Sequence, residues 1–354
     1  MVPSTAPTTR ARNMPSFGML GFLVVMAVVA LAAPFVVPGY QALNLSYALI
    51  FAIAILGLNI LTGYSGQISL GHGAFLAIGA YASAIAQQKM GINYLVSIPI
   101  AGVICGLLGF GFGFPALRLE GIYLALATFA LAVAAPTLLK KPEGITGGVK
   151  GIILPPYTSP TALLTDDQYF YLLCLAIAAV CFLLAWNILR GRTGRAFRAI
   201  RDGDLAAVAF GVNLASYKTL AFAISAFLAG TAGALYGIAT GFVSADAYPF
   251  QLSILLLVGA VIGGLGTLEG ALIGGFFSQF LPQFSQQALK GINTQVANAA
   301  PTVTQGVLLL VVMFVARQGV AGLIRANIHR LRYPVQQSAG GAPEEPPPEQ
   351  TGPL

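Results

Sequence analysis

Charged side chains are scarce in this sequence: they make up 8% of its 354 residues, whereas hydrophobic residues make up 57%. A soluble domain carries about 25% charged residues, so this chain has too little polar surface to cover a water-soluble globule. Its repeated apolar segments of about 20 residues match the thickness of a bilayer core, which only helices or closed barrels cross. We therefore expect an all-α polytopic membrane protein with about ten transmembrane or re-entrant helices.

Residues that carry catalytic or metal chemistry are also few. His72 and His329 are the only histidines and stand far apart, so a histidine-based metal or catalytic cluster is not expected. The three cysteines (Cys105, Cys174 and Cys181) lie in apolar runs, which predicts free thiols. There is neither a phosphate-binding loop for ATP nor a nucleophile elbow with a credible triad. The chain is expected to be non-catalytic and to bind no cofactor, so energy for pumping must come from a partner or an ion gradient.

The apolar segments organise the chain into one membrane domain, 17–333. Polar tails precede and follow it, at 1–16 and 334–354, and both are expected to be disordered. The ten apolar segments are 17–37, 43–61, 70–88, 95–117, 121–139, 169–189, 218–240, 251–267, 270–287 and 302–317. Very short connections near 62–69 and 266–270 predict that one or two of these helices are broken or re-entrant.

The basic residues predict the orientation of the chain. If the N-terminus is cytoplasmic and the segments alternate, thirteen basic residues fall in inner segments and five in outer loops, and every arginine lies inside. This asymmetry follows the positive-inside rule. It predicts an even number of crossings, with both termini in the cytoplasm of a multi-pass inner-membrane protein. The polar segment 190–218 is then the main cytoplasmic loop.

The longest predicted outer loop covers 140–168 and is rich in glycine and proline. Two interpretations are open for it: part of an outer vestibule or receptor-docking surface, or a plain solvated loop. The acidic residues near apolar spans are Glu120, Asp246 and Glu269, and none lies clearly in the middle of a span. Ion-driven transporters usually need such mid-span groups, which weakens the hypothesis of an ion-coupled secondary transporter or channel.

A stretch rich in glycine and small polar residues, 61–81, joins two apolar segments. Broken backbone at membrane depth is tolerated where it lines a cavity or is buried in protein, and half-helix ends there can offer free N–H groups to a carboxylate. The candidates for a translocation pathway are Gly63, Ser65, Gly66, Gln67, Ser69 and His72. The alternative is a close helix–helix contact made possible by glycine, with His72 simply hydrogen-bonded.

The cytoplasmic loop 190–218 alternates basic and apolar side chains at helical spacing. Asp202 or Asp204 is placed to cap a short helix over Leu205–Phe210, which Gly211 would end. A rigid helix below the membrane, with Phe197 and Phe210 available, is a surface that a soluble subunit could grip. The alternative is that the arginines only set topology and bind anionic lipid. The candidate coupling residues are Arg195, Phe197, Arg198, Ile200, Asp204, Ala206, Ala207 and Gly211.

Taken together, five stretches resemble the permease subunits of branched-chain amino-acid ABC importers, the LivH/LivM family and its LivM branch in particular. They are GYSGQISLGHGAFLAIGAYASA at 63–84, LRLEGIYLALATFAL at 117–131, GITGGVKGI at 144–152, the long run from GRTGRAFRAIRDGDLAAVAFG at 191 to 237, and GAVIGGLGTLEGALIGG at 259–275. The resemblance covers most of the chain from 40 to 317.

The resemblance implies partners and a mechanism. Such permeases pair as two membrane subunits, identical or related, with two cytoplasmic ATPase subunits that use ATP and Mg²⁺, and a periplasmic or extracellular binding protein delivers the substrate. The Ala-Ala-x-x-x-Gly core of the coupling loop falls on Ala206, Ala207 and Gly211, and Leu205 stands where relatives carry an acid. The implied cargo is a branched-chain or related hydrophobic amino acid. Urea, short amides or aromatic acids are the alternative cargo.

Overall fold

The computed structural model describes residues 30–119, 121–160 and 164–289, with ten scattered residues between 303 and 322. Within this part of the chain nearly all regular structure is helical, as expected from the composition. Some predictions lie wholly or mostly outside the described residues: the tails 1–16 and 334–354, the apolar segments 17–37 and 302–317, and Glu120.

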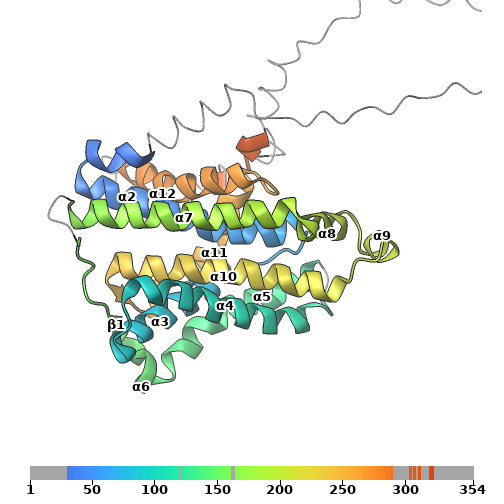
Figure 1. The fold of residues 1–354 in the computed structure, drawn as a ribbon, viewed down its shortest axis with the longest axis horizontal. Helices are drawn as coiled ribbons and strands as arrows, with labels where there is room; N and C mark the ends of the chain where they lie inside the picture. The colour runs from blue at the N-terminus through green and yellow to red at the C-terminus, as the bar shows by residue number, and fades with distance from the viewer. Residues whose placement is uncertain are drawn as a thin grey trace, which may run out of the picture.

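Long helices account for every predicted apolar segment between 43 and 287. They are α2 (Gly39–Leu58), α3 (His72–Met90), α4 (Tyr94–Ala116), α5 (Ile122–Lys140), α7 (Asp166–Arg190), α10 (Leu214–Thr240), α11 (Phe250–Gly263) and α12 (Leu268–Leu289). Figure 1 shows them running roughly along one axis of the molecule, so that connections gather at its two ends. The fold is an all-α membrane bundle.

Six segments of the described chain are long and apolar enough to cross a membrane. They contain α2, α4, α5, α7, α10 and α11. Helices α3 and α12 are not among them, because polar side chains such as His72, Gln87, Gln279 and Gln283 interrupt their sequences. Because α3 is buried along most of its length, neighbouring helices rather than lipid surround it.

Helices α2 and α10 form the centre of the bundle. The most apolar 18-residue stretches of these two helices are 83% and 78% buried inside the structure, whereas those of α4, α5 and α7 are 28% to 33% buried. Helix α10 packs against α2, α3 and α4. A side chain on Gly79 of α3 would collide with the backbone of Gly230 in α10, and a side chain on Gly230 would collide with Cys105 of α4. Small residues allow this close backbone contact between membrane helices. The predicted free thiols are confirmed: Cys105, Cys174 and Cys181 are unpaired and buried.

The predicted outer loop contains short regular elements. It contains α6 (Glu143–Thr146), the 3-10 turn η2 (Gly148–Lys150) and strand β1 (Ile152–Ile153). Strand β1 pairs antiparallel with β2 (Phe242–Val243), which follows α10 and precedes the turn η3 (Ala245–Ala247). An ion pair between Lys140 and Asp246, 2.6 Å long, ties the same two regions. The loops at one end of the bundle are therefore held together by strand pairing and an ion pair.

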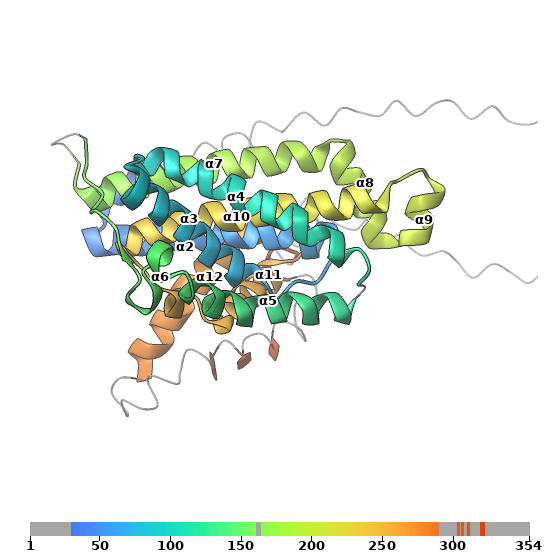
Figure 2. The same cartoon turned by 90° about the horizontal axis from the view of Figure 1, so that it is seen from below.

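The opposite end carries the polar segment that follows α7. It folds into two short helices, α8 (Arg192–Asp202) and α9 (Asp204–Ala209), which project beyond the long helices in both views (Figures 1 and 2). Both short connections predicted to break a helix are observed near this end. The chain leaves α2 through a π-helical turn, η1 (Asn59–Tyr64), and is irregular over 65–71, and a tight turn over 264–267 separates α11 from α12.

Candidate functional site

Helix α8 is anchored to the membrane bundle through one apolar face. Phe197 is fully buried and Ile200 is 5% exposed, and the Phe197 ring meets the Tyr217 ring of α10 edge to face at 6.4 Å. On the α7 side, Arg198 donates to the carbonyls of Gly194 and Leu189 at 3.1 and 3.3 Å. Phe197 was expected to be available to a partner. Its burial shows that it instead holds α8 in place.

Helix α9 begins at Gly203, whose extended backbone separates it from α8. The prediction of an aspartate cap is wrong: Gly203 occupies the N-cap and no side chain caps the helix. Asp204 stands in the first turn, where its charge complements the helix dipole, and it pairs with Lys218 of α10. Gly211 adopts φ +77° just beyond the helix, and the Val212 N–H closes onto the Ala207 carbonyl at 3.0 Å. The predicted end of the helix at Gly211 is therefore observed.

The outer face of α9, together with Phe210 directly after the helix, exposes large apolar side chains. Leu205 is 90% exposed, Phe210 87% and Val208 53%, and Ala206 and Arg195 also face solvent. Ala207, in contrast, is buried. Leu205 and Val208 were not among the sequence candidates. Leu205 could have been found from its position, since it replaces an acid with an apolar residue beside a membrane.

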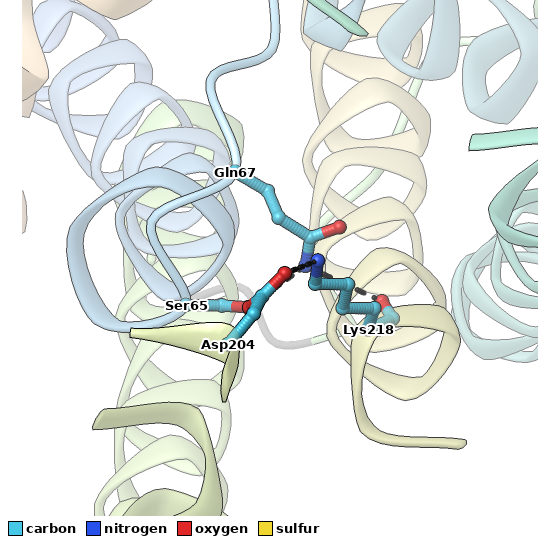
Figure 3. Close-up of polar contacts among 4 residues, drawn as sticks. All are labelled: Ser65, Gln67, Asp204 and Lys218. Carbon is cyan, nitrogen blue, oxygen red and sulfur yellow. Dashed lines mark hydrogen bonds and ion pairs between the residues drawn. The ribbon is translucent and has the colours of Figure 1, made fainter. Parts of the chain in front are cut away.

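The backbone break after α2 contains five of the six pathway candidates, Gly63, Ser65, Gly66, Gln67 and Ser69. Gln67 donates through Nε2 to Ser65 Oγ at 2.8 Å and to the Lys218 carbonyl at 3.5 Å, while Thr62 Oγ1 donates to the Gln67 carbonyl at 3.0 Å. Figure 3 shows Ser65 and Gln67 facing the Asp204–Lys218 pair. The break is thus hydrogen-bonded to α10 beside the start of α9.

A cavity of about 160 Å³ lies at this junction. Its lining comes from the break, the start of α5, the end of α8, and α9 and α10. The lining residues are Ser65, Gly66, Gln67, Leu119, Gly121, Leu124, Ile200, Arg201, Asp204 and Lys218. The structure therefore brings the first pathway candidates together with the coupling candidates, which the sequence had placed about 130 residues apart.

Ser69 and His72 lie deeper and are engaged in packing contacts. His72 Nε2 lies 2.6 Å from Ser225 Oγ, and Ser225 donates its single hydroxyl proton to the Gly57 carbonyl at 2.8 Å. Nε2 of His72 must therefore be the protonated nitrogen in this contact. The backbone N–H of Gly71 donates to Ser69 Oγ at 3.2 Å.

Other N–H groups at the start of α3 are occupied as well. The N–H of Leu70 donates to Thr128 Oγ1 and that of Gly73 to Ser253 Oγ, both at 2.9 Å. These groups are therefore not free for a carboxylate. At Ser69 and His72 the contacts match the alternative of close helix packing with a hydrogen-bonded histidine.

The second break, between α11 and α12, is fastened to the first by Asn59. This residue is fully buried. Its Oδ1 accepts from the Gly266 N–H at 2.6 Å, and its Nδ2 donates to the Thr267 carbonyl at 2.7 Å. Arg201 of α8 donates to the Gly63 carbonyl at 2.6 Å. Neither Asn59 nor Arg201 was among the sequence candidates, although an asparagine within an apolar run was a visible signal.

Acidic residues in the described part of the chain lie at helix ends or in loops. Asp246 lies in η3 and is paired with Lys140, and Glu269 stands in the first turn of α12. The described residues also contain no cluster of three or more histidine, cysteine or acidic groups that could hold a metal ion. Nothing in this part of the chain supplies the mid-span charge that ion coupling usually needs.

Comparison with known proteins identifies the family. Residues 42–316 match the model described as branched-chain amino acid transport system / permease component. The chain is 34% identical over 270 residues to the high-affinity branched-chain amino acid transport system permease protein LivM of Escherichia coli K12. It is 33% identical over the same length to the LivM protein of Salmonella typhimurium. Each match covers 70% of this chain and 64% of the relative's length.

The LivH permease protein of Escherichia coli K12 also matches, at 25% identity over 77% of this chain and 91% of its own length. No solved structure gives a significant match. The family consists of transport permeases, which are non-catalytic subunits, and the six apolar segments agree with a multi-pass inner-membrane protein. This chain therefore belongs to the branched-chain amino acid transport permease family.

Proposed function

We propose that this chain is one membrane subunit of an ATP-driven importer and forms the translocation path for branched-chain or related hydrophobic amino acids. Its proposed partners are two cytoplasmic ATPase subunits, which bind ATP and Mg²⁺, a second permease subunit, LivH-like or identical, and an external substrate-binding protein. Support comes from the family match and from relatives named for branched-chain amino acid transport. Both termini are placed in the cytoplasm, in agreement with the distribution of arginine.

The main observation behind the proposal is the exposed surface of Leu205, Val208 and Phe210, which we call the α9 tip. Leu205, Val208 and Phe210 present apolar surface at the end of a loop whose other face is buried in the bundle. Clustered large apolar groups on an exposed surface mark protein interaction sites. We propose that an ATPase subunit covers this tip, while the basic residues Arg195 and Arg198 flank the contact.

The mechanism follows from how the loop is fixed. ATP binding favours one arrangement of the ATPase pair, and this differential binding shifts the conformational equilibrium of the permease. Phe197, Ile200 and Ala207 are buried on the permease side, so movement of the tip is transmitted to the bundle. The inner mouth of the path is formed by Gly63, Ser65, Gly66 and Gln67. The break is stabilised by packing contacts of Ser69 and His72.

Reconstitution tests the class of transporter. The tagged chain is expected to purify with ATPase subunits and to support uptake in vesicles only when ATP is supplied. Purification without an ATPase, together with uptake that continues without ATP, would instead favour a secondary transporter or channel.

The cargo needs its own test, because one relative is named an autoinducer 2 import permease, LsrC of Enterobacter sp. 638, at 28% identity. The same architecture therefore serves more than one type of solute. Excess unlabelled leucine is expected to suppress uptake of labelled valine. If urea, a short amide or an aromatic acid competes and leucine does not, the cargo assignment is wrong.

A further inference from the structure

Arg201 connects the cytoplasmic helix α8 to the membrane bundle through a bond with the bundle's backbone. Its Nη1 donates to the carbonyl of Gly63 at 2.6 Å. That carbonyl belongs to η1, the turn that ends the long α2–η1 helix. Carbonyls in the last turn of a helix carry partial negative charge and lack intrahelical partners, so a cation bound there is favourable. The guanidinium therefore acts as a charged cap on this helix.

The same side chain also touches the second break. A Cβ atom added to Gly266 would lie 2.8 Å from Arg201 Nη1, and one added to Gly66 would lie 3.3 Å from Arg201 Cα. Both glycines have left-handed backbone, with φ +74° and +73°. Each break thus presents a bare backbone surface to Arg201, and a larger residue in either place would push it away.

Asn59 connects the break after α2 to the break between α11 and α12. It holds Gly266 and Thr267 through bonds of 2.6 and 2.7 Å from within η1 itself. A displacement of η1 must therefore move the turn before α12, and both lie against the Arg201 guanidinium. Arg198, one helical turn earlier, bonds instead to Gly194 and Leu189 within the α7–α8 region.

We propose that Arg201 is the positioning residue through which movement of α8 and α9 reaches both membrane breaks at once. The inference rests on the proposed function and extends it, because it assigns the transmission step to one side chain. An arginine suits the task because its planar fork can bond a carbonyl and lie along a second surface together, whereas lysine offers a single point charge.

The experiment uses the complete complex of permease, ATPase and binding protein in lipid vesicles. Arg201→Met removes the charge and the donor, and Arg201→Lys keeps the charge on a side chain of shorter reach without the fork. Arg192→Met is the matched control, because Arg192 is exposed like Arg201 but lies at the other end of α8 and does not line the cavity. Gel filtration checks that each variant assembles.

The first readout is labelled leucine imported per ATP hydrolysed. Allosteric coupling between sites commonly amounts to roughly 5–150-fold, so Arg201→Met is expected to lower this ratio about tenfold while the ATPase stays bound and active. Arg201→Lys should recover part of the ratio, and Arg192→Met should leave it unchanged. An unchanged ratio in Arg201→Met would overturn the inference.

The second readout is hydrogen–deuterium exchange with and without trapped nucleotide, which does not depend on the identity of the cargo. In the wild type, nucleotide should change exchange in peptides covering 60–71, 262–268 and 203–211. In Arg201→Met only the 203–211 response should persist. If nucleotide changes exchange in all three peptides of that variant as much as in the wild type, another contact transmits the movement.

These outcomes separate the inference from the proposed function. If the wild-type chain binds no ATPase, the importer assignment fails and the inference fails with it. If the wild type imports leucine at the expense of ATP and Arg201→Met does so equally well, the importer assignment stands and only the role of Arg201 is refuted.

Discussion

Helices α8 and α9 are neighbours in sequence and differ in what they do with their apolar side chains. Helix α8 turns Phe197 and Ile200 into the bundle, whereas α9 turns Leu205 and Phe210 to solvent. Only Gly203 separates the two helices, and its extended backbone changes the direction of the chain. This difference indicates separate roles: α8 packs as part of the body of the permease, and α9 is the part exposed for a partner to bind.

Truncation at the anchor should give the largest effect. Phe197→Ala is expected to destabilise the fold by about 3–5 kcal/mol, the usual cost of emptying a buried aromatic site. Thermal denaturation in detergent measures this loss. The matched Phe210→Ala variant should melt within a few degrees of the wild type, because its ring is 87% exposed. Equal losses in the two variants would remove the distinction between the helices.

Charging the tip should break binding without unfolding the chain. Loss of a hot-spot residue at the centre of a protein interface typically costs about 2 kcal/mol or more, so Phe210→Glu with Leu205→Glu should weaken ATPase binding by about thirtyfold. Ala206→Glu should act in the same direction. Co-purification from mild detergent measures binding, and membrane insertion should be normal. Retained binding in the double variant would argue that the loop is only a charge anchor.

The orientation of the tip can be disturbed through the backbone. Gly211 has φ +77°, a conformation that costs an L-residue about 1–2 kcal/mol and a β-branched residue more. Gly211→Val is expected to misplace Phe210 and to lower ATP-dependent uptake several-fold, with less effect on melting temperature than Phe197→Ala. Gly144, which has no neighbour within 4 Å of an added Cβ and lies in α6 at the opposite end of the bundle, provides the control Gly144→Ala.

The smallest effect is expected from the ion pair that joins α9 to α10. The side chains of Lys218 and Asp204 are 13% and 29% exposed, so the pair is partly screened, and a coupling energy of about 1 kcal/mol is expected. A double-mutant cycle with Asp204→Asn and Lys218→Met measures it by denaturation. A coupling energy near zero would show that α9 is held by Ala207 and the backbone alone.

The apolar pattern was sufficient to predict the helical bundle. Segments predicted at 43–61, 95–117 and 218–240 lie within a few residues of α2 with η1, α4 and α10. Long apolar runs have few alternatives in a membrane, because backbone groups must be satisfied within the segment. The three-residue spacing of Phe197 and Ile200 likewise placed both on one face of α8.

The sequence did not reveal which face of the loop is buried or how the breaks are joined. The helix is interrupted at Gly203, so the spacing of the buried residues in α8 does not predict whether Phe210 is buried or exposed. The bonds of Asn59 to Gly266 and of Arg201 to Gly63 connect residues more than 130 positions apart. Such contacts arise from packing of the whole bundle, which local spacing does not encode.

Site-specific photo-crosslinking in intact cells tests the central claim most directly. A photoreactive amino acid is placed at position 210 on the α9 tip or at position 197 on the α8 anchor, with the partner genes expressed from their native locus. We predict an adduct with an ATPase subunit from position 210 and none from position 197. Adducts of equal yield from both positions, or none from position 210 in a strain that retains ATP-dependent uptake, would contradict this prediction.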